Sequence, residues 1–147
     1  IISIWKIKSF LLTLTAFCLT GNMPLMFGCN NTDLTKLMHS NKQAQVFHRQ
    51  TGSFAEHNAL GDYYDAIEDL IDDLVETYQG KHGLLKGYQN YDLVDYSSNS
   101  QVIKYFTELE SDVEAIYPTI KDTYIQNQLD EVKQLINKTL YKLKFLK

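Results

Sequence analysis

FHRQTGSFAEHNALGDYYDAIEDLIDDLVETYQG, residues 47–80, is the stretch that decides the fold of this chain. Ser53 is followed three residues later by Glu56, which is the pattern of a capping box and predicts that a helix begins there. Gly80 is typical of a helix stop, so we expect a helix from Ser53 to Gln79. Apolar side chains recur along it at alternating spacings of four and three residues, at Leu60, Tyr64, Ile67, Ile71, Leu74 and Tyr78.

The polar side of this expected helix is acidic. No Lys or Arg occurs between His57 and Gly80, whereas a solvated helical face usually mixes both signs of charge. Like charges close together destabilise a helix, so we expect a positive group to compensate them. At about 100° per residue, one sector beside the apolar stripe holds His57, Asp65, Glu68, Asp72 and Glu76.

Imidazole and carboxylate groups in this arrangement suit a metal ion such as iron, manganese or zinc. A helix rises about 1.5 Å per residue, so His57 and Glu76 would lie about 28 Å apart and could not share an ion within one helix. Two copies of the helix, packed antiparallel across a twofold axis, would instead bring His57 of one copy near Asp72 and Glu76 of the other. The sequence therefore predicts a metal site between two subunits.

This pattern resembles that of the Dps-type mini-ferritins, within the ferritin-like superfamily. In those proteins a Phe-His lies near the end of the first helix, a Gly and a Phe follow in the turn, a His opens the second helix and an Asp-x-x-x-Glu pair comes later. The segment is also similar to small Dps-like proteins that phages encode. The matching residues are Phe47, His48, Gly52, Phe54, His57, Asp72 and Glu76.

The resemblance covers roughly residues 30–147, with its diagnostic motifs within residues 47–80, and two positions differ from the family pattern. Gly61 stands where the family usually has an Asp four residues after the second His, with Asp62 and Asp65 nearby. Arg49 stands where a Trp commonly follows the first His, and the turn between the two helices is shorter.

The resemblance implies a homo-oligomer that binds iron and oxidises Fe(II) at a dinuclear site between subunits, as a ferroxidase does. It implies a dimer that pairs through the first two helices, which a hollow shell would extend. Manganese or zinc are alternatives to iron. The alternative function is a non-enzymatic interaction or virion-associated protein that keeps the helical bundle without metal chemistry, and Gly61 and Arg49 keep it open. The candidate metal ligands are His48, His57, Asp72 and Glu76, with Asp65 and Asp62 as further candidates.

The composition indicates one globular domain. The chain has 147 residues, 44% of them hydrophobic and 22% charged, and two prolines leave room for long helices. The formal net charge of −4 argues against nucleic acid as a partner, because a negative surface repels the phosphate backbone. Both cysteines, Cys18 and Cys29, precede the expected bundle, so we expect no disulfide within it.

Residues 1–29 form a hydrophobic segment with several interpretations. Lys6 and Lys8 precede an apolar run from Phe10 to Leu19, which is the anatomy of a signal peptide, and Cys29 follows a stretch that resembles a lipoprotein cleavage site. A real signal implies an exported or lipid-anchored protein. Alternatively, the segment is an upstream artefact, with Met23, Met26 or Met38 as the start and a cytoplasmic location. A structural helix is the third interpretation.

Residues 30–147 are expected to form an all-α, ferritin-like four-helix bundle with a long crossover between the second and third helices. The first helix should run from residue 31 or 32 to Arg49, with Leu34, Leu37, Met38, Ala44 and Phe47 on its core side. Residues 80–98 should form the crossover, pack through their leucines and Val94, and hold a short helix, with His82 as a surface residue. The third helix should begin at Ser98 or Asn99 and end at Tyr117 before Pro118, and the fourth should follow Asp122. Their expected core residues are Val102, Tyr105, Phe106, Leu109, Val113, Ile116, Ile125, Leu129, Val132, Ile136, Leu140 and Leu143.

Overall fold

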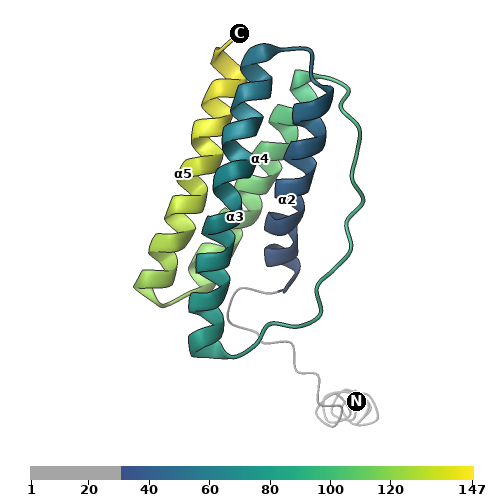
Figure 1. Cartoon of the computed structure of the whole chain (residues 1–147). Helices are drawn as coiled ribbons and strands as arrows, with labels where there is room; N and C mark the ends of the chain where they lie inside the picture. Colours follow the sequence, from purple (N-terminus) through teal and green to yellow (C-terminus); the bar gives the residue numbers. More distant parts are fainter. Residues whose placement is uncertain (1–30) are drawn as a thin grey trace, which may run out of the picture.

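The computed structural model describes residues 31–147, with side chains from Asp33 onward, as a four-helix bundle (Figure 1). The interpretations of residues 1–29 lie outside the described residues. Helix α2 spans Asn31–Gln50, α3 Phe54–His82, α4 Asn99–Ile116 and α5 Thr123–Phe145, and a short 3₁₀ turn, η2, spans Tyr117–Thr119. No strand occurs within residues 31–147. The prediction of an all-α bundle is confirmed.

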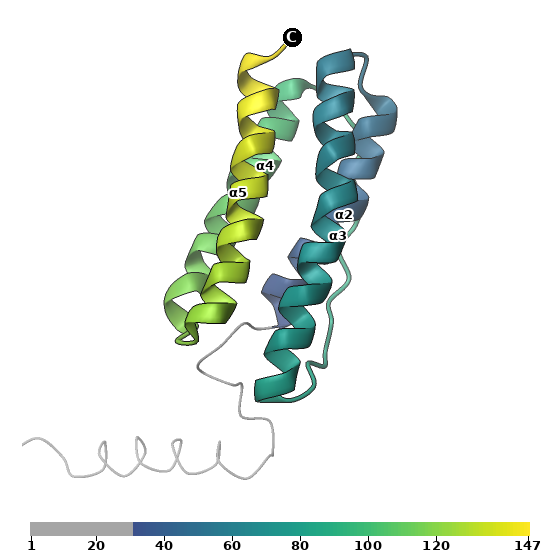
Figure 2. The same cartoon turned by 60° about the vertical axis from the view of Figure 1, so that its left-hand side comes forward.

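Two tight turns pair the helices into hairpins. The backbone N–H of Thr51 donates to the carbonyl of Phe47 and closes α2, and the Ser53 hydroxyl accepts from the Glu56 backbone N–H to open α3. Pro118 lies in η2, which ends α4 and turns the chain into α5. Because both turns are short, α2 runs antiparallel to α3, and α4 antiparallel to α5 (Figure 2).

The connection of residues 83–98 has no regular secondary structure and runs beside α2 along the length of the bundle (Figure 1). The Thr35 hydroxyl accepts from the Gln89 backbone N–H, His39 binds the Asp92 carbonyl, and Gln50 accepts from the Tyr96 backbone N–H. Midway, the Gln43 side-chain amide makes two hydrogen bonds with the backbone of one residue, Val94. The connection therefore returns the chain to the end of the bundle at which α3 begins, and α4 runs in the same direction as α3.

The core fills the space between the four helices, with α2 packed on α3, and α5 packed on both α3 and α4. Its side chains are almost wholly apolar, and the expected core residues of the third and fourth helices are buried there except Tyr105, which is partly buried. Removing this apolar area from water is the main stabilising contribution to the fold. The largest fully buried side chains include Tyr63, Phe47, Phe106, Leu34, Leu37, Leu60, Ile67, Leu74, Ile125, Leu129 and Ile136.

The expected core positions of Met38 and Tyr64 were wrong. Met38, expected in the core, is 46% exposed and lines a surface pocket instead. Tyr64 is only partly buried, whereas its neighbour Tyr63 is completely buried. Tyr63 can enter the core because its hydroxyl has a partner there, the Ser40 hydroxyl at 2.7 Å, which itself donates to the carbonyl of Leu37.

The predicted end of the second helix and the predicted packing of the connection were also wrong. Helix α3 continues through Gly80 to His82, and the positive φ of 90° at Gly83 provides the stop instead. The connection holds no helix, and Leu84, Leu93 and Val94 are exposed while Leu85 is partly buried. Hydrogen bonds from α2 hold this segment, so its apolar side chains are not needed to anchor it.

Candidate functional site

His48 and His57 face each other at the turn between α2 and α3. Their ring centroids lie 3.6 Å apart and the ring planes are inclined by 24°, so the imidazoles are stacked. The Nδ1 atom of His48 lies 2.7 Å from the carbonyl oxygen of His57, and the Nδ1 atom of His57 lies 2.9 Å from the carbonyl oxygen of His48. The two residues are therefore joined by a reciprocal pair of hydrogen bonds.

These hydrogen bonds determine where each neutral imidazole carries its proton. A carbonyl oxygen can only accept, so the Nδ1 atom must be the protonated donor in both rings. The lone pair of each neutral ring then lies on Nε2, which is the atom that binds a metal ion when the other nitrogen is held by a carbonyl. The tautomer of each ring therefore leaves Nε2 able to bind a metal ion.

The His48 ring lies between the aromatic ring of Tyr64 and a position that has no side chain, Gly61. The Tyr64 ring meets the His48 ring edge to face at a centroid distance of 5.1 Å, and the Asn41 side chain holds the Tyr64 carbonyl at 2.7 Å. On the other side of the ring, in α3, a Cβ atom at Gly61 would lie 3.4 Å from Cε1 and 3.5 Å from Nδ1 of His48. A side chain at position 61 would thus touch this ring at ordinary contact distance.

The four candidate carboxylates lie elsewhere on α3 and are all exposed. Asp62 forms an ion pair with Lys142 of α5 at 2.6 Å. Asp65, Asp72 and Glu76 have no ion pair within residues 33–147. Of these four acids, only Asp62 therefore has the positively charged partner that was expected. Because α3 is one continuous helix, Asp72 and Glu76 lie about 22 Å and 28 Å along its axis from His57.

The structure therefore brings together His48 and His57 and leaves the acids apart from them within one chain. Among the described residues, no group of three or more His, Cys, Asp or Glu side chains is close enough to hold a metal ion. Asp72 instead lines a pocket of about 220 Å³ between α2 and α3, together with Met38, Lys42, Glu68, Val75 and Tyr88.

The chain matches a known protein family over most of its helical region. Residues 48–143 match DUF5856, described as a family of unknown function. The chain belongs to this family. No curated protein and no solved structure gives a match. The DUF5856 region begins at His48 and contains all six candidate metal ligands, whereas most of α2 precedes it.

A buried carboxylate, Glu56, lies beside the histidine pair of this DUF5856 protein, although the sequence predicted only a capping role for it. Glu56 is 3% exposed and accepts hydrogen bonds from the Thr51 hydroxyl at 2.5 Å, the Tyr96 hydroxyl at 2.9 Å and the Asn99 amide at 3.2 Å. The predicted capping box is thus half formed, because Glu56 binds these groups and the Ser53 N–H donates to Thr51 instead. Glu56 fastens the turn to the end of the connection and the start of α4.

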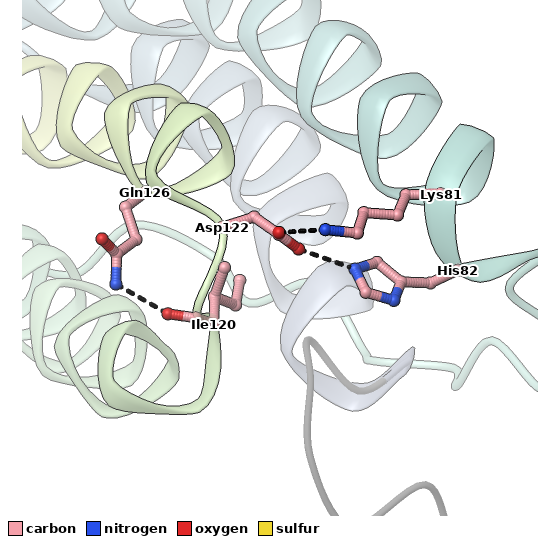
Figure 3. Close-up of polar contacts among 5 residues, drawn as sticks. All are labelled: Lys81, His82, Ile120, Asp122 and Gln126. Atoms are coloured by element: carbon pink, nitrogen blue, oxygen red, sulfur yellow. Dashed lines mark hydrogen bonds and ion pairs between the residues drawn. The ribbon is translucent and has the colours of Figure 1, made fainter.

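A second polar cluster lies at the other end of the DUF5856 bundle. His82, expected as a surface residue, is exposed but lies 3.0 Å from the Asp122 carboxylate through Nε2, and Lys81 forms an ion pair with the same carboxylate (Figure 3). The Lys81 ammonium, more than His82, holds the pKa of Asp122 below its usual value of 3.8. Gln126 donates to the Ile120 carbonyl at 2.6 Å and completes the cluster. The cluster ties α3 to the start of α5.

Within residues 31–147 of this DUF5856 chain, no helix is long and apolar enough to cross a membrane.

Proposed function

We propose that this protein binds Fe(II) at a site shared between two copies of the chain and oxidises it, as Dps-type mini-ferritins do. The observation that carries the proposal is the reciprocal His48–His57 pair, in which both Nδ1 atoms donate to backbone carbonyls. The Nε2 lone pairs are left for a metal ion without any change of tautomer.

The carboxylates would come from the second copy. Two α3 helices packed antiparallel across a twofold axis place the His57 end of one against the Asp72–Glu76 end of the other, and a twofold contact repeats this at both ends. Neutral imidazoles with carboxylates suit Fe(II), and manganese and zinc are alternative occupants of the same ligand set. Asp65 and Asp62 are further candidate ligands, although Asp62 must first release Lys142.

The reaction is an electron transfer from the bound substrate. Two Fe(II) ions give one electron each to hydrogen peroxide, which takes up two protons and yields two water molecules. Dioxygen is the alternative oxidant. The α3 acids that have no ion pair within residues 33–147 would attract Fe(II) to the site, and would line the inner surface of a hollow shell in which Fe(III) mineral collects.

The course of the chain supports the same assignment. A long connection between the second and third helices distinguishes ferritin-like bundles from simple up-down-up-down bundles, and residues 83–98 run beside α2 in this way (Figure 1). The support is at the level of topology, and the chemistry of the proposal rests on the histidine pair.

One observation favours the second candidate function, a non-enzymatic interaction or virion-associated protein with the same bundle. Gly61 leaves the space beside the His48 ring without a carboxylate, at the position where mini-ferritins usually have an Asp. In this case the histidine pair only staples the turn between α2 and α3, and metal ions do not bind.

Anaerobic titration of the full chain with Fe(II), followed by metal analysis, distinguishes the two functions. His57→Ala and the double variant Asp72→Ala, Glu76→Ala should each lose iron binding. A mixture of the two variants should regain part of it, because one of the two sites in a mixed dimer is intact. The matched control is Asp69→Ala, Asp73→Ala, which removes two exposed acids from the same helix and should bind iron normally.

Thermal unfolding gives a second readout. Metal that binds only the folded dimer stabilises it by linkage, so Fe(II), Mn(II) or Zn(II) should raise the melting temperature of the wild type and of the control variant. If none of these ions changes either the stoichiometry or the melting temperature, the iron proposal fails and the interaction protein takes its place.

A further inference from the structure

A tyrosine and a histidine outside the proposed iron site form a directional hydrogen bond between α4 and α2. The Tyr105 hydroxyl lies 3.0 Å from Nδ1 of His39, and Nε2 of His39 lies 3.1 Å from the carbonyl oxygen of Asp92 in the connection. Because that carbonyl can only accept, Nε2 carries the proton in the neutral ring. Nδ1 is therefore an acceptor, and the Tyr105 phenol donates its proton toward it.

The environment of Tyr105 makes this acceptor chemically important. Burial raises the pKa of the Tyr105 phenol well above its usual value, so the phenolate does not form at neutral pH. A neutral phenol that loses an electron becomes a strongly acidic cation, and a cation is costly in a half-buried position. Loss of the electron is favoured only if a positioned base takes the proton in the same step. Nδ1 of His39 is such a base.

Tyr105 also belongs to a series of aromatic rings that runs through the bundle. Its ring contacts Phe47 and Phe106 at centroid distances of 5.8 and 5.6 Å, and Phe106 contacts Tyr63 at 4.7 Å. On the outer side, the Tyr91 ring lies 5.7 Å from the His39 ring. Tyr91, His39 and Tyr105 line a pocket of about 260 Å³, so small oxidants in solvent can approach the pair.

We propose that Tyr105 is a redox-active residue that gives one electron to hydroxyl radical while its phenol proton passes to Nδ1 of His39. The O–H bond of Tyr105 breaks, an N–H bond forms on His39, and hydroxyl radical is reduced to hydroxide. The products are a neutral tyrosyl radical, an imidazolium and hydroxide, so charge is conserved, and the imidazolium then returns its proton to the hydroxide to form water.

This activity goes beyond the proposed iron oxidation and does not require it. Hydroxyl radical forms wherever peroxide takes one electron from Fe(II) in solution, so a bundle without any metal site would still meet it. The proposal therefore stands or falls on experiments with metal-free protein.

The alternative for His39 is a purely structural role, in which it holds the connection against α2 through the Asp92 carbonyl. His39→Gln separates the two roles, because a glutamine amide can still donate to that carbonyl but is not a base. Tyr105→Phe keeps the ring and removes the proton and the electron source. The matched control is Tyr91→Phe, which removes another phenol from the same pocket.

The experiment uses photochemically generated ruthenium(III) tris-bipyridine as the one-electron oxidant of metal-free full-length protein. Tyrosyl radical is followed by transient absorbance and by electron paramagnetic resonance of frozen samples. We expect Tyr105→Phe to lose most of the radical signal and Tyr91→Phe to retain it. A positioned base contributes a factor of roughly 10² or more, so the radical should form roughly 10²-fold more slowly in His39→Gln. The wild-type rate should fall in D₂O, because a proton moves in the rate-determining step.

Two results would overturn the proposal. Radical yield in Tyr105→Phe equal to that of the wild type would show that another tyrosine is oxidised. A rate in D₂O equal to that in H₂O, together with an unchanged rate in His39→Gln, would show that His39 takes no proton and only holds the connection. Helix content by circular dichroism confirms that each variant compared is folded, and a His39→Ala variant rescued by added imidazole replaces His39→Gln if that variant unfolds.

Discussion

The side-chain amide of Gln43 pairs with both backbone groups of Val94: its Nε2 donates to the Val94 carbonyl at 2.7 Å and its Oε1 accepts from the Val94 N–H at 2.9 Å. Gln43 is completely buried although it lies on α2, and Val94 lies 51 residues away in the connection. Gln43 thus satisfies the backbone N–H and C=O of one residue of the connection, as a neighbouring strand does at the edge of a sheet.

Replacing this glutamine should loosen the connection. Gln43→Leu keeps the approximate volume but leaves two backbone groups without partners, so we expect a loss of about 1–3 kcal/mol in the free energy of unfolding. Urea unfolding followed by circular dichroism measures the loss. The control is Gln134→Leu at an exposed position of α5, which should change stability by less than about 0.5 kcal/mol. Equal stabilities of the two variants would contradict the assigned role of Gln43.

Two substitutions of Glu56 test how much its buried carboxylate contributes to stability. Glu56→Ala leaves the donors of Thr51, Tyr96 and Asn99 without their acceptor, and we expect it to cost about 3 kcal/mol or more. Glu56→Gln should cost less, because its carbonyl oxygen can still accept from the two hydroxyls while the Asn99 amide turns over. Urea unfolding of the two variants should therefore rank Ala below Gln. The reverse order would contradict the assigned role of Glu56 as the acceptor for these two hydroxyls.

Asp122 should make stability depend on acid pH. Lys81 lowers the pKa of Asp122 in the folded state below its usual value of 3.8. The contribution to stability is therefore fully present above about pH 4 and is lost as the pH falls below that value, where the unfolded chain binds the proton first. Asp122→Asn should flatten this part of the profile of unfolding free energy against pH, measured by urea unfolding. Glu131→Gln, at an exposed position of α5, should leave it unchanged.

Tyr63 should make the stability of the fold depend on alkaline pH. Burial raises the pKa of the Tyr63 phenol in the folded state. Above about pH 10 the unfolded chain loses this proton while the folded chain keeps it, so stability falls as the pH rises. Tyr63→Phe removes that dependence and should lose less stability between neutral and alkaline pH, although it costs about 1 kcal/mol at pH 7 through the lost Ser40 hydrogen bond. Identical alkaline slopes would contradict this account.

Gly61→Asp tests the proposed iron site by a gain of binding. A Cβ at this position would lie 3.4 Å from the His48 ring without displacing it, so the added carboxylate would reach the metal beside that ring. We expect about tenfold tighter Zn(II) or Fe(II) binding, or about 1.4 kcal/mol, by calorimetric titration. Gly80→Asp adds the same charge to the same helix where nothing lies within 4 Å, and should have no effect. Equal affinities for the two variants would argue that His48 is not a ligand.

The helices were predictable because their apolar spacing follows the helical repeat and their ends carry strong signals. Ser53 and Ser98 accept the hydrogen bonds that begin α3 and α4, and Pro118 follows the end of α4. Gly80 misled the prediction of where α3 ends, because a glycine inside a helix costs only about 1 kcal/mol and packing can offset it. The exchange of Tyr63 for Tyr64 could not be foreseen, because it depends on a buried hydroxyl partner, Ser40, in another helix.

The candidate site was predictable only in part. His48 and His57 were both expected as metal ligands from the motif order, but their contact depends on reciprocal hydrogen bonds to backbone carbonyls whose positions no side-chain pattern reveals. The hydrogen bonds between α2 and the connection could have been predicted from the sequence. Their side chains, Thr35, His39 and Gln43, are polar, lie four positions apart and share the buried or half-buried side of α2. Such a polar row beside an apolar stripe indicates a helix that binds backbone. Whether Asp72 and Glu76 meet the histidines depends on a second copy of the chain.

The connection is also the segment at which the chain could be cut into two helical fragments. Each hairpin has its own short turn, so a chain cut near Gly87 yields two fragments, one with α2 and α3 and the other with the rest of the connection, α4 and α5. The second fragment would keep the backbone groups of Gln89, Asp92 and Val94, and the first would keep the α2 side chains that bind them. After the cut, α2 would bind the connection as a receptor binds a peptide ligand, through the hydrogen bonds of Thr35, His39 and Gln43.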